Sequence, residues 1–66
     1  MKLFEYAILM HPTKKEREDG KATRILVEVT RILAADEHKA AMVAARAIPE
    51  ENLNDLDRVE VAVRPF

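Results

Sequence analysis

The chain has 66 residues, which is enough for one domain and no more; 48% are hydrophobic, 35% are charged, and the net charge is −1. This composition is typical of a folded protein and excludes a disordered or collagen-like chain. Because cysteine is absent, neither disulfides nor thiolate zinc sites can stabilise the fold. A core of this size rarely contributes more than about 3–5 kcal/mol, so association with a second copy or another protein is the expected source of further stability.

The first predicted element is a strand over Leu3–His11, in which both faces are mainly apolar. Phe4, Tyr6, Ile8 and Met10 share one face by the two-residue period of a strand. Since the other face is also mostly apolar, this strand is predicted to lie at the centre of a sheet.

A charged loop, Pro12–Lys21, and a second strand, Ala22–Ala34, are predicted next. The loop ends near the only glycine, Gly20, which we expect to have a positive φ where the chain turns back. The strand contains β-branched residues in alternation with polar ones. This alternation weakens over residues 31–33, which indicates a bulge or bend there.

One helix is predicted over Glu37–Ile48, with Asp36 as its N-cap. Alanines spaced three and four residues apart form one face of it, so the helix can lie close to a sheet above a thin core. The acidic segment that follows, Glu50–Asp57, is predicted to be rich in turns, with Leu53 and Leu56 as its apolar anchors.

The last strand, Arg58–Arg64, has the cleanest alternation, so the order of elements is ββαβ. A strand–helix–strand crossover makes the second and third strands parallel. We therefore predict one domain over residues 1–66, with an α+β fold of two layers: a three-stranded, mainly antiparallel sheet of order 2-1-3 and one helix on one face. The predicted core comprises Phe4, Tyr6, Ile8, Ile25, Val27, Val29, Val43, Ala44, Ala47, Ile48, Val59, Val61 and Val63.

A single helix leaves the second face of the sheet uncovered, and this face is the predicted interaction surface. Its apolar members are expected to be Leu3, Ala7, Leu9, Leu26 and Ala62. Pro65 ends the strand and restricts Arg64 to an extended conformation, so Phe66 is expected to project beyond the sheet with little backbone freedom. Its ring either folds back onto Leu53 or Leu56 or enters a pocket of a neighbouring subunit. The candidate interaction residues are Leu3, Leu9, Leu26, Arg64 and Phe66.

No residue pattern indicates catalysis or a cofactor. The chain lacks serine and cysteine for a nucleophilic triad, and one glycine cannot form a glycine-rich phosphate loop. His11 and His38 lack the spacing of metal ligands, and the acidic segment lacks the glycine and terminal glutamate of a calcium loop. We therefore expect a protein that is not an enzyme, with no catalytic residue, metal or cofactor.

Nucleic acid and membranes are disfavoured as partners. Five basic residues lie between positions 14 and 24, but three carboxylates interleave with them and aromatic residues are scarce. The longest wholly apolar run, Ala7–Met10, is far shorter than a membrane span. The N-terminal segment also lacks the features of a signal peptide, so Met1 is expected to begin a cytosolic chain.

The closing segment carries the most specific likeness to known proteins. Together with the opening MKLFEYA strand and HPT turn, residues 48–51 (IPEE), Leu56–Asp57 and Val59–Phe66 (VEVAVRPF) resemble small conserved proteins of tailed bacteriophages whose function is unknown. The likeness covers nearly the whole chain, although Asn52 stands where relatives often carry an aromatic residue. It implies a phage context in the host cytoplasm or the virion, and it implies no activity.

Three functions are consistent with these features. The first is a non-enzymatic assembly or interaction module, associated with the capsid or virion and bound to itself or to another phage protein. The second is a phage-encoded regulator or inhibitor that binds a host protein or a small signalling ligand. The third is a nucleic-acid accessory protein, whose binding would weaken steeply with salt.

Overall fold

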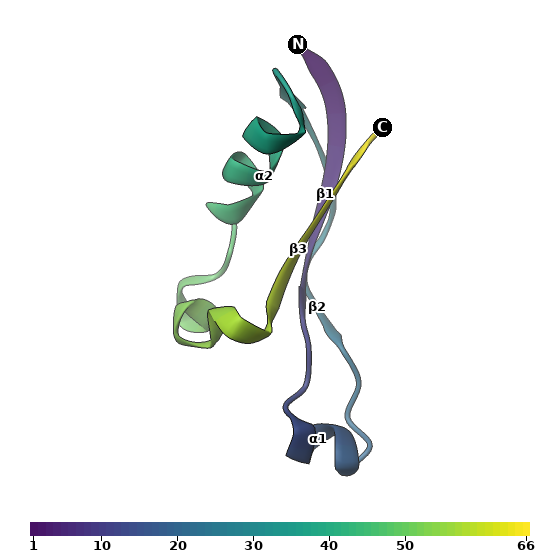
Figure 1. Cartoon of the computed structure of the whole chain (residues 1–66), viewed down its shortest axis with the longest axis vertical. Coiled ribbons are helices and arrows are strands. Elements are labelled where there is room, and N and C mark those ends of the chain that lie inside the picture. Colours follow the sequence, from purple (N-terminus) through teal and green to yellow (C-terminus); the bar gives the residue numbers. More distant parts are fainter.

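A computed structural model describes all 66 residues and shows the predicted α+β fold (Figure 1). Strands β1 (Lys2–Met10), β2 (Arg24–Ala34) and β3 (Val59–Pro65) form one sheet in the order β2-β1-β3. Because β1 is antiparallel to both neighbours, β2 and β3 run parallel to each other. The predicted central position of the first strand and the predicted strand order are both confirmed.

Helix α2 (Glu37–Ala45) covers one face of the sheet, which Figure 1 shows nearly edge-on. As predicted, Asp36 caps it: the carboxylate accepts a hydrogen bond of 2.8 Å from the backbone N–H of Lys39. The helix ends three residues earlier than predicted, and the chain turns from Arg46 onward. None of the helices has the length and hydropathy that crossing a membrane requires.

The predicted loop between β1 and β2 contains a short helix, α1 (Lys14–Glu18). A capping box begins it: the hydroxyl of Thr13 accepts from the backbone N–H of Glu16 at 3.1 Å, and the Glu16 carboxylate accepts from the backbone N–H of Thr13 at 3.0 Å. Gly20 then adopts the expected positive φ, 86°, where the chain turns into β2. The prediction of a loop over Pro12–Lys21 was therefore wrong at Lys14–Glu18, which is helical.

A 3₁₀ segment, η1 (Glu50–Arg58), with a kink at Asp55, replaces the predicted turns between α2 and β3. Its two leucines are not anchors, because Leu53 and Leu56 are 49% and 51% exposed. The buried residue of η1 is Asn52, whose side-chain amide donates to the sulfur of Met10 at 3.9 Å. A polar side chain thus occupies the position at which the segment contacts the sheet.

The core lies between the sheet and α2, and it is thin. It consists of two small clusters of buried side chains, one around Phe4, Ala34 and Ala40 and one around Tyr6, Ile8 and Ala44. Only Ile8 is both large and completely buried. The alanines of α2 bring the helix close to the sheet, as predicted, but they contribute little apolar area to it.

Irregular pairing in β2 changes which of its residues face the core. The β1–β2 register shifts between Tyr6 and Ile8 and again between Ile8 and Leu9, so β2 contains two extra residues there. These shifts lie nearer the start of β2 than the bend predicted at residues 31–33. Each shift by one residue exchanges the two faces of a strand.

The predicted core was consequently wrong at several positions. Ile25 and Val29 are 58% and 61% exposed, and Val43 on the flank of α2 is also exposed. Leu26, predicted on the uncovered face, instead packs against the cluster of Tyr6, Ile8 and Ala44. The remaining predicted core residues are buried or pack half-buried against the two clusters: Phe4, Tyr6, Ile8, Val27, Ala44, Ala47, Ile48, Val59, Val61 and Val63.

The buried amide of Asn52 should limit the stability of the fold. Its side-chain oxygen has no hydrogen-bond partner although the residue is only 8% exposed, and such a group costs about 1–3 kcal/mol. Asn52→Leu is therefore expected to raise the melting temperature by several degrees, since about 1 kcal/mol shifts a domain of this size by 4–8 °C. Thermal unfolding of Asn52→Leu beside the exposed control Asn54→Leu measures this, and a lower melting temperature for Asn52→Leu would contradict it.

Candidate functional site

The face of the sheet opposite α2, which we call the open face, carries apolar side chains from all three strands together with several charged ones. Residues paired across neighbouring strands share a face, and the β1 residues with odd numbers point away from α2. In Figure 1 no element lies on this side of the sheet. The apolar residues of the open face are Leu3, Ala7, Leu9, Ile25, Val29, Leu33, Ala62 and Phe66.

The centre of the open face is hollowed. Ala7 pairs with Ala62 in the middle of the sheet, and these small side chains, with Val29 beside them, line a shallow depression of 270 Å³. Glu5 and Arg64 border it at the end of the sheet nearer the termini. Small residues at the centre let another surface approach the backbone closely, while larger apolar residues lie toward both ends.

Phe66 extends the open face at the end of the sheet where the termini lie. Its backbone N–H donates to the carbonyl of Leu3 at 3.1 Å, so the chain continues the β3 pairing past Pro65. The Arg31 guanidinium lies over its ring, 4.2 Å from the ring centre. The alternative in which the ring folds back onto Leu53 or Leu56 was therefore wrong, and the ring remains 61% exposed.

Removing this ring should affect folding little. An exposed cation–π contact is worth about 0.5–1 kcal/mol, and Phe66→Ala keeps the backbone hydrogen bond to Leu3. We expect its free energy of unfolding, measured in urea at low protein concentration, to fall by no more than about 1 kcal/mol. A loss of 2 kcal/mol or more on that scale would mean that the ring belongs to the core.

Charged residues of the open face are paired within the sheet. Arg64 donates through Nε to the carboxylate of Glu5, directly across the β1–β3 pair. At the other end, the ring of His11 lies between the Glu60 carboxylate, 2.6 Å from Nε2, and the Thr23 hydroxyl, 3.0 Å from Nδ1. Both groups tie β1 to a neighbouring strand.

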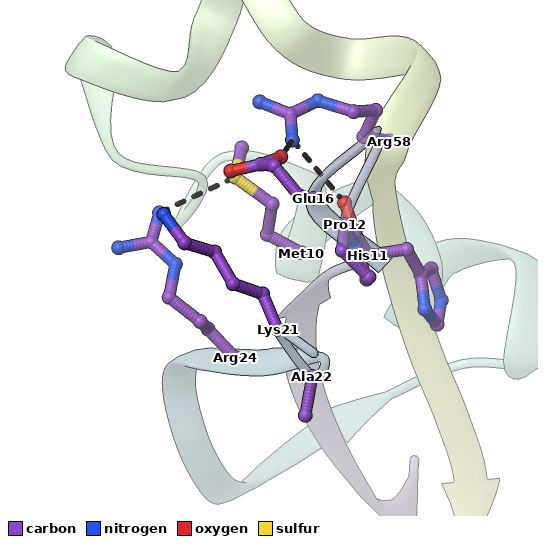
Figure 2. Close-up of a pocket in the computed structure, with 8 residues that line it drawn as sticks. All are labelled: Met10, His11, Pro12, Glu16, Lys21, Ala22, Arg24 and Arg58. Atoms are coloured by element: carbon purple, nitrogen blue, oxygen red, sulfur yellow. Dashed lines mark hydrogen bonds and ion pairs between the residues drawn. The ribbon is translucent and has the colours of Figure 1, made fainter. Parts of the chain in front are cut away.

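The Thr23–His11–Glu60 arrangement has the order of a hydroxyl, a base and a carboxylate. Nucleophilic catalysis also needs a cavity for substrate and donors aimed at a developing oxyanion. A pocket lies near His11, where β1 ends, but it cannot hold a substrate for this group because the His11 ring points away from it (Figure 2). No three histidine, aspartate or glutamate side chains converge as metal ligands. The arrangement is therefore suited to joining β1, β3 and the start of β2.

A second cavity, which we call the hairpin pocket, lies where β1 ends and β2 begins, away from the open face (Figure 2). Its volume is 420 Å³, and it has mostly polar walls. Arg58 donates to the carboxylate of Glu16 at 2.8 Å and lies 3.6 Å from that of Asp55. Lys21 and Arg24 line the same pocket. The pocket thus gathers cations from the turn before β2 and from the end of η1.

Glu16 has an altered acidity because of this setting. Its hydrogen bond from the Thr13 backbone N–H lowers the pKa of the Glu16 carboxyl, and the charges of Arg58 and Lys21 lower it further, against the opposing effect of desolvation. The carboxylate therefore contributes stability that is complete above the ordinary value of 4.5 and is lost as the pH falls through the lowered pKa of the folded state.

A pH titration followed by NMR tests this effect. The Glu16 side-chain carbon is expected to titrate below 4.5, with the Thr13 amide resonance following the same curve. In Glu16→Gln, which keeps a capping side chain, the Thr13 amide should lose that titration. A Glu16 midpoint at or above 4.5 would contradict the assigned hydrogen bond.

The structure brings most of the predicted interaction residues together. Leu3, Leu9, Arg64 and Phe66 lie on the open face, whereas Leu26 lies against the core. Sequence reasoning missed the open-face residues contributed by β2, because the shifted register cannot be read from the alternation. It also missed the hairpin pocket, which is lined by two of the five basic residues between positions 14 and 24, Lys21 and Arg24.

Comparison with known proteins adds no relative to this description. No protein family matches the chain, and no curated protein or solved structure is significantly similar to it. The open face and the hairpin pocket are therefore the features of the molecule that indicate its function.

Proposed function

We propose that this chain is a non-enzymatic interaction module that associates with a second copy of itself through the open face. The observation that carries the proposal is the set of eight exposed or half-buried apolar side chains on one face of a sheet whose other face has so thin a core. Exposed apolar side chains gathered on one surface mark an interaction site more often than chance. Packing two such sheets face to face gives a two-sheet sandwich whose interior is apolar.

Charge complementarity supports a second copy as the occupant. Arg64 and Glu60 lie two residues to either side of Ala62 on the open face. A twofold axis running across the strands at Ala7 and Ala62 reverses the strand direction of one copy. It therefore brings Arg64 of one copy, which also contacts its own Glu5, opposite Glu60 of the other, which also contacts its own His11, twice in the dimer. On β1 the same axis brings Leu9 of one copy opposite Glu5 of the other and Leu3 opposite His11, so apolar contact is concentrated at Ala7, Val29 and Ala62.

The available area indicates a dimer that depends on concentration. The molecule extends 43 Å along its longest axis and 15 Å along its shortest, and the second of these crosses the strands (Figure 1). The nine residues of β1 extend about 30 Å, so with a width of 15 Å the open face offers about 450 Å² in projection. Stable interfaces bury about 800 Å² per partner. The open face is smaller than this, so we expect weak affinity and a dimer that forms only at high protein concentration.

Sedimentation equilibrium over a range of protein concentrations tests the proposal. The expected result is a reversible change from monomer to dimer mass, which Val29→Glu at the centre of the open face shifts to at least about tenfold higher concentration. Val43→Glu makes the same substitution at an exposed position on α2 and should leave the equilibrium unchanged. A monomer mass throughout, or equal effects of both substitutions, would overturn the proposal.

The resemblance of the closing segment to small phage proteins supports a setting for this module. We propose that it acts in an infected host cell or in the assembled virion, where a symmetric unit can bind a further phage protein. A mass-spectrometric inventory of purified particles tests the virion location. Recovery at a fixed copy number is expected for a virion component. Presence in infected cells but absence from particles would instead favour the regulator or inhibitor role.

A further inference from the structure

The hairpin pocket contains positive charge that the protein does not neutralise. Lys21, Arg24 and Arg58 line it with a single carboxylate, Glu16, so its walls carry an excess of two positive charges, which falls to one when Asp55, 3.6 Å from Arg58, is counted. Figure 2 shows Glu16 between Arg58 and the other two cations. This excess occurs in a chain whose net charge is −1.

The three cations differ in whether they already have partners. Arg58 is engaged by Glu16 and Asp55. By contrast, the only hydrogen bond of the Arg24 guanidinium is to the sulfur of Met10 at 3.3 Å, a weak acceptor. Lys21 forms no ion pair within the chain. Two cationic side chains with free donors therefore line one cavity.

The pocket is otherwise firmly constructed. Met10 at its floor is buried, and the capping box of Thr13 fixes Glu16 on the opposite wall. The backbone N–H of His11 donates to the carbonyl of Arg58 at 2.8 Å, which holds β1 and the start of β3 together. The volume of 420 Å³ lies in the range of pockets that bind small molecules, about 300–1,000 Å³.

We propose that the hairpin pocket binds a small molecule through a phosphate group, with Arg24 and Lys21 as its ligands. A phosphate dianion neutralises the two free charges, and the fork of the Arg24 guanidinium matches two of its oxygens. The remaining volume accommodates an organic group attached to the phosphate. A nucleic-acid backbone is a poorer occupant, because residues 14–19 carry as many carboxylates as cations and so offer no excess positive charge to a chain of phosphates.

Glu16 gives the proposal a distinctive consequence. Its carboxylate repels an anion in the pocket while holding Arg58 in place. Glu16→Gln retains a capping side chain but removes the charge and releases Arg58, so phosphate binding should become tighter. Arg24→Gln should weaken binding about tenfold, since it removes charge-assisted hydrogen bonds. Arg17→Gln makes an equal change of charge on α1 outside the pocket and should have little effect.

NMR titration of the full chain with inorganic phosphate, and separately with adenosine monophosphate, tests the proposal. In a buffer of about 0.15 M salt, we expect the amide shifts of Lys21, Ala22 and Arg24 to saturate as phosphate is added. The affinity should be highest for Glu16→Gln, intermediate for the wild type and lowest for Arg24→Gln. No saturation at millimolar phosphate, or equal weakening by Arg24→Gln and Arg17→Gln, would overturn it. Tight binding of a single-stranded oligonucleotide without binding of either small probe would also overturn it in favour of nucleic acid.

Discussion

Ala44→Glu is expected to abolish folding of the isolated chain. Ala44 is completely buried where α2 approaches the sheet, and it packs in the same cluster as Tyr6 and Ile8. A carboxylate there has no cationic partner and no room, and burying an unpaired charge costs several kcal/mol. That cost equals or exceeds the stability of about 3–5 kcal/mol available to a core of this size.

Ala45→Glu is the matched control for this substitution. Position 45 is the next residue of α2 and is exposed, so the same change should leave a cooperative thermal transition close to that of the wild type. Circular dichroism of both variants compares them directly. A folded Ala44→Glu variant with an unchanged melting temperature would show that another face of α2 packs on the sheet.

The second large effect is expected at Ile8, the only large side chain that is completely buried. Ile8→Ala removes several methyl and methylene groups from the contact between the sheet and α2 and leaves a cavity there. Such substitutions cost about 2–5 kcal/mol, so most of the stability should be lost. Urea unfolding at low protein concentration measures the loss.

Ile25→Ala is the control for Ile8→Ala because it removes the same atoms from a position that is mostly exposed. We expect its cost to remain below about 1 kcal/mol, since little apolar area is lost from the folded monomer. Equal losses for the two variants would mean that the β1–β2 register differs from the one described here.

The fold could be predicted from the sequence because local and long-range signals agree. The two apolar faces of β1 require neighbours on both sides, and Asp36 marks the start of α2, the longer of the two α-helices. The start of α1 was also encoded, in the pair Thr13 and Glu16, but the charged composition of the segment obscured this capping box.

The candidate site could be predicted only in part. The existence of an uncovered face follows from a three-stranded sheet with one covering helix, and Leu3 and Leu9 lie on it as expected. Which residues lie on this face depends on two register shifts in β2. These shifts place Leu26 against the core and Ile25 and Val29 on the open face. A register shift is a property of the pairing between strands, so the alternation within β2 alone does not reveal it.

The position of Phe66 was unpredictable for a similar reason. The sequence predicted that Phe66 projects past Pro65 with little backbone freedom. The position of its ring depends on a contact with Arg31, which is far away along the chain. The hairpin pocket likewise combines Arg58 with residues of the distant β1–β2 connection. Such constellations arise only when the sheet is assembled.

Isotope-filtered nuclear Overhauser measurements on a mixture of labelled and unlabelled chains show directly whether two copies associate through the open face. At a concentration where the mass is that of a dimer, packing through the open face predicts contacts between copies from the methyl groups of Ala7, Val29 and Ala62, and from the ring of Phe66 to His11 of the other copy. Contacts between copies confined to α2 or to the outer backbone edges of β2 and β3, with none from the open face, would contradict it.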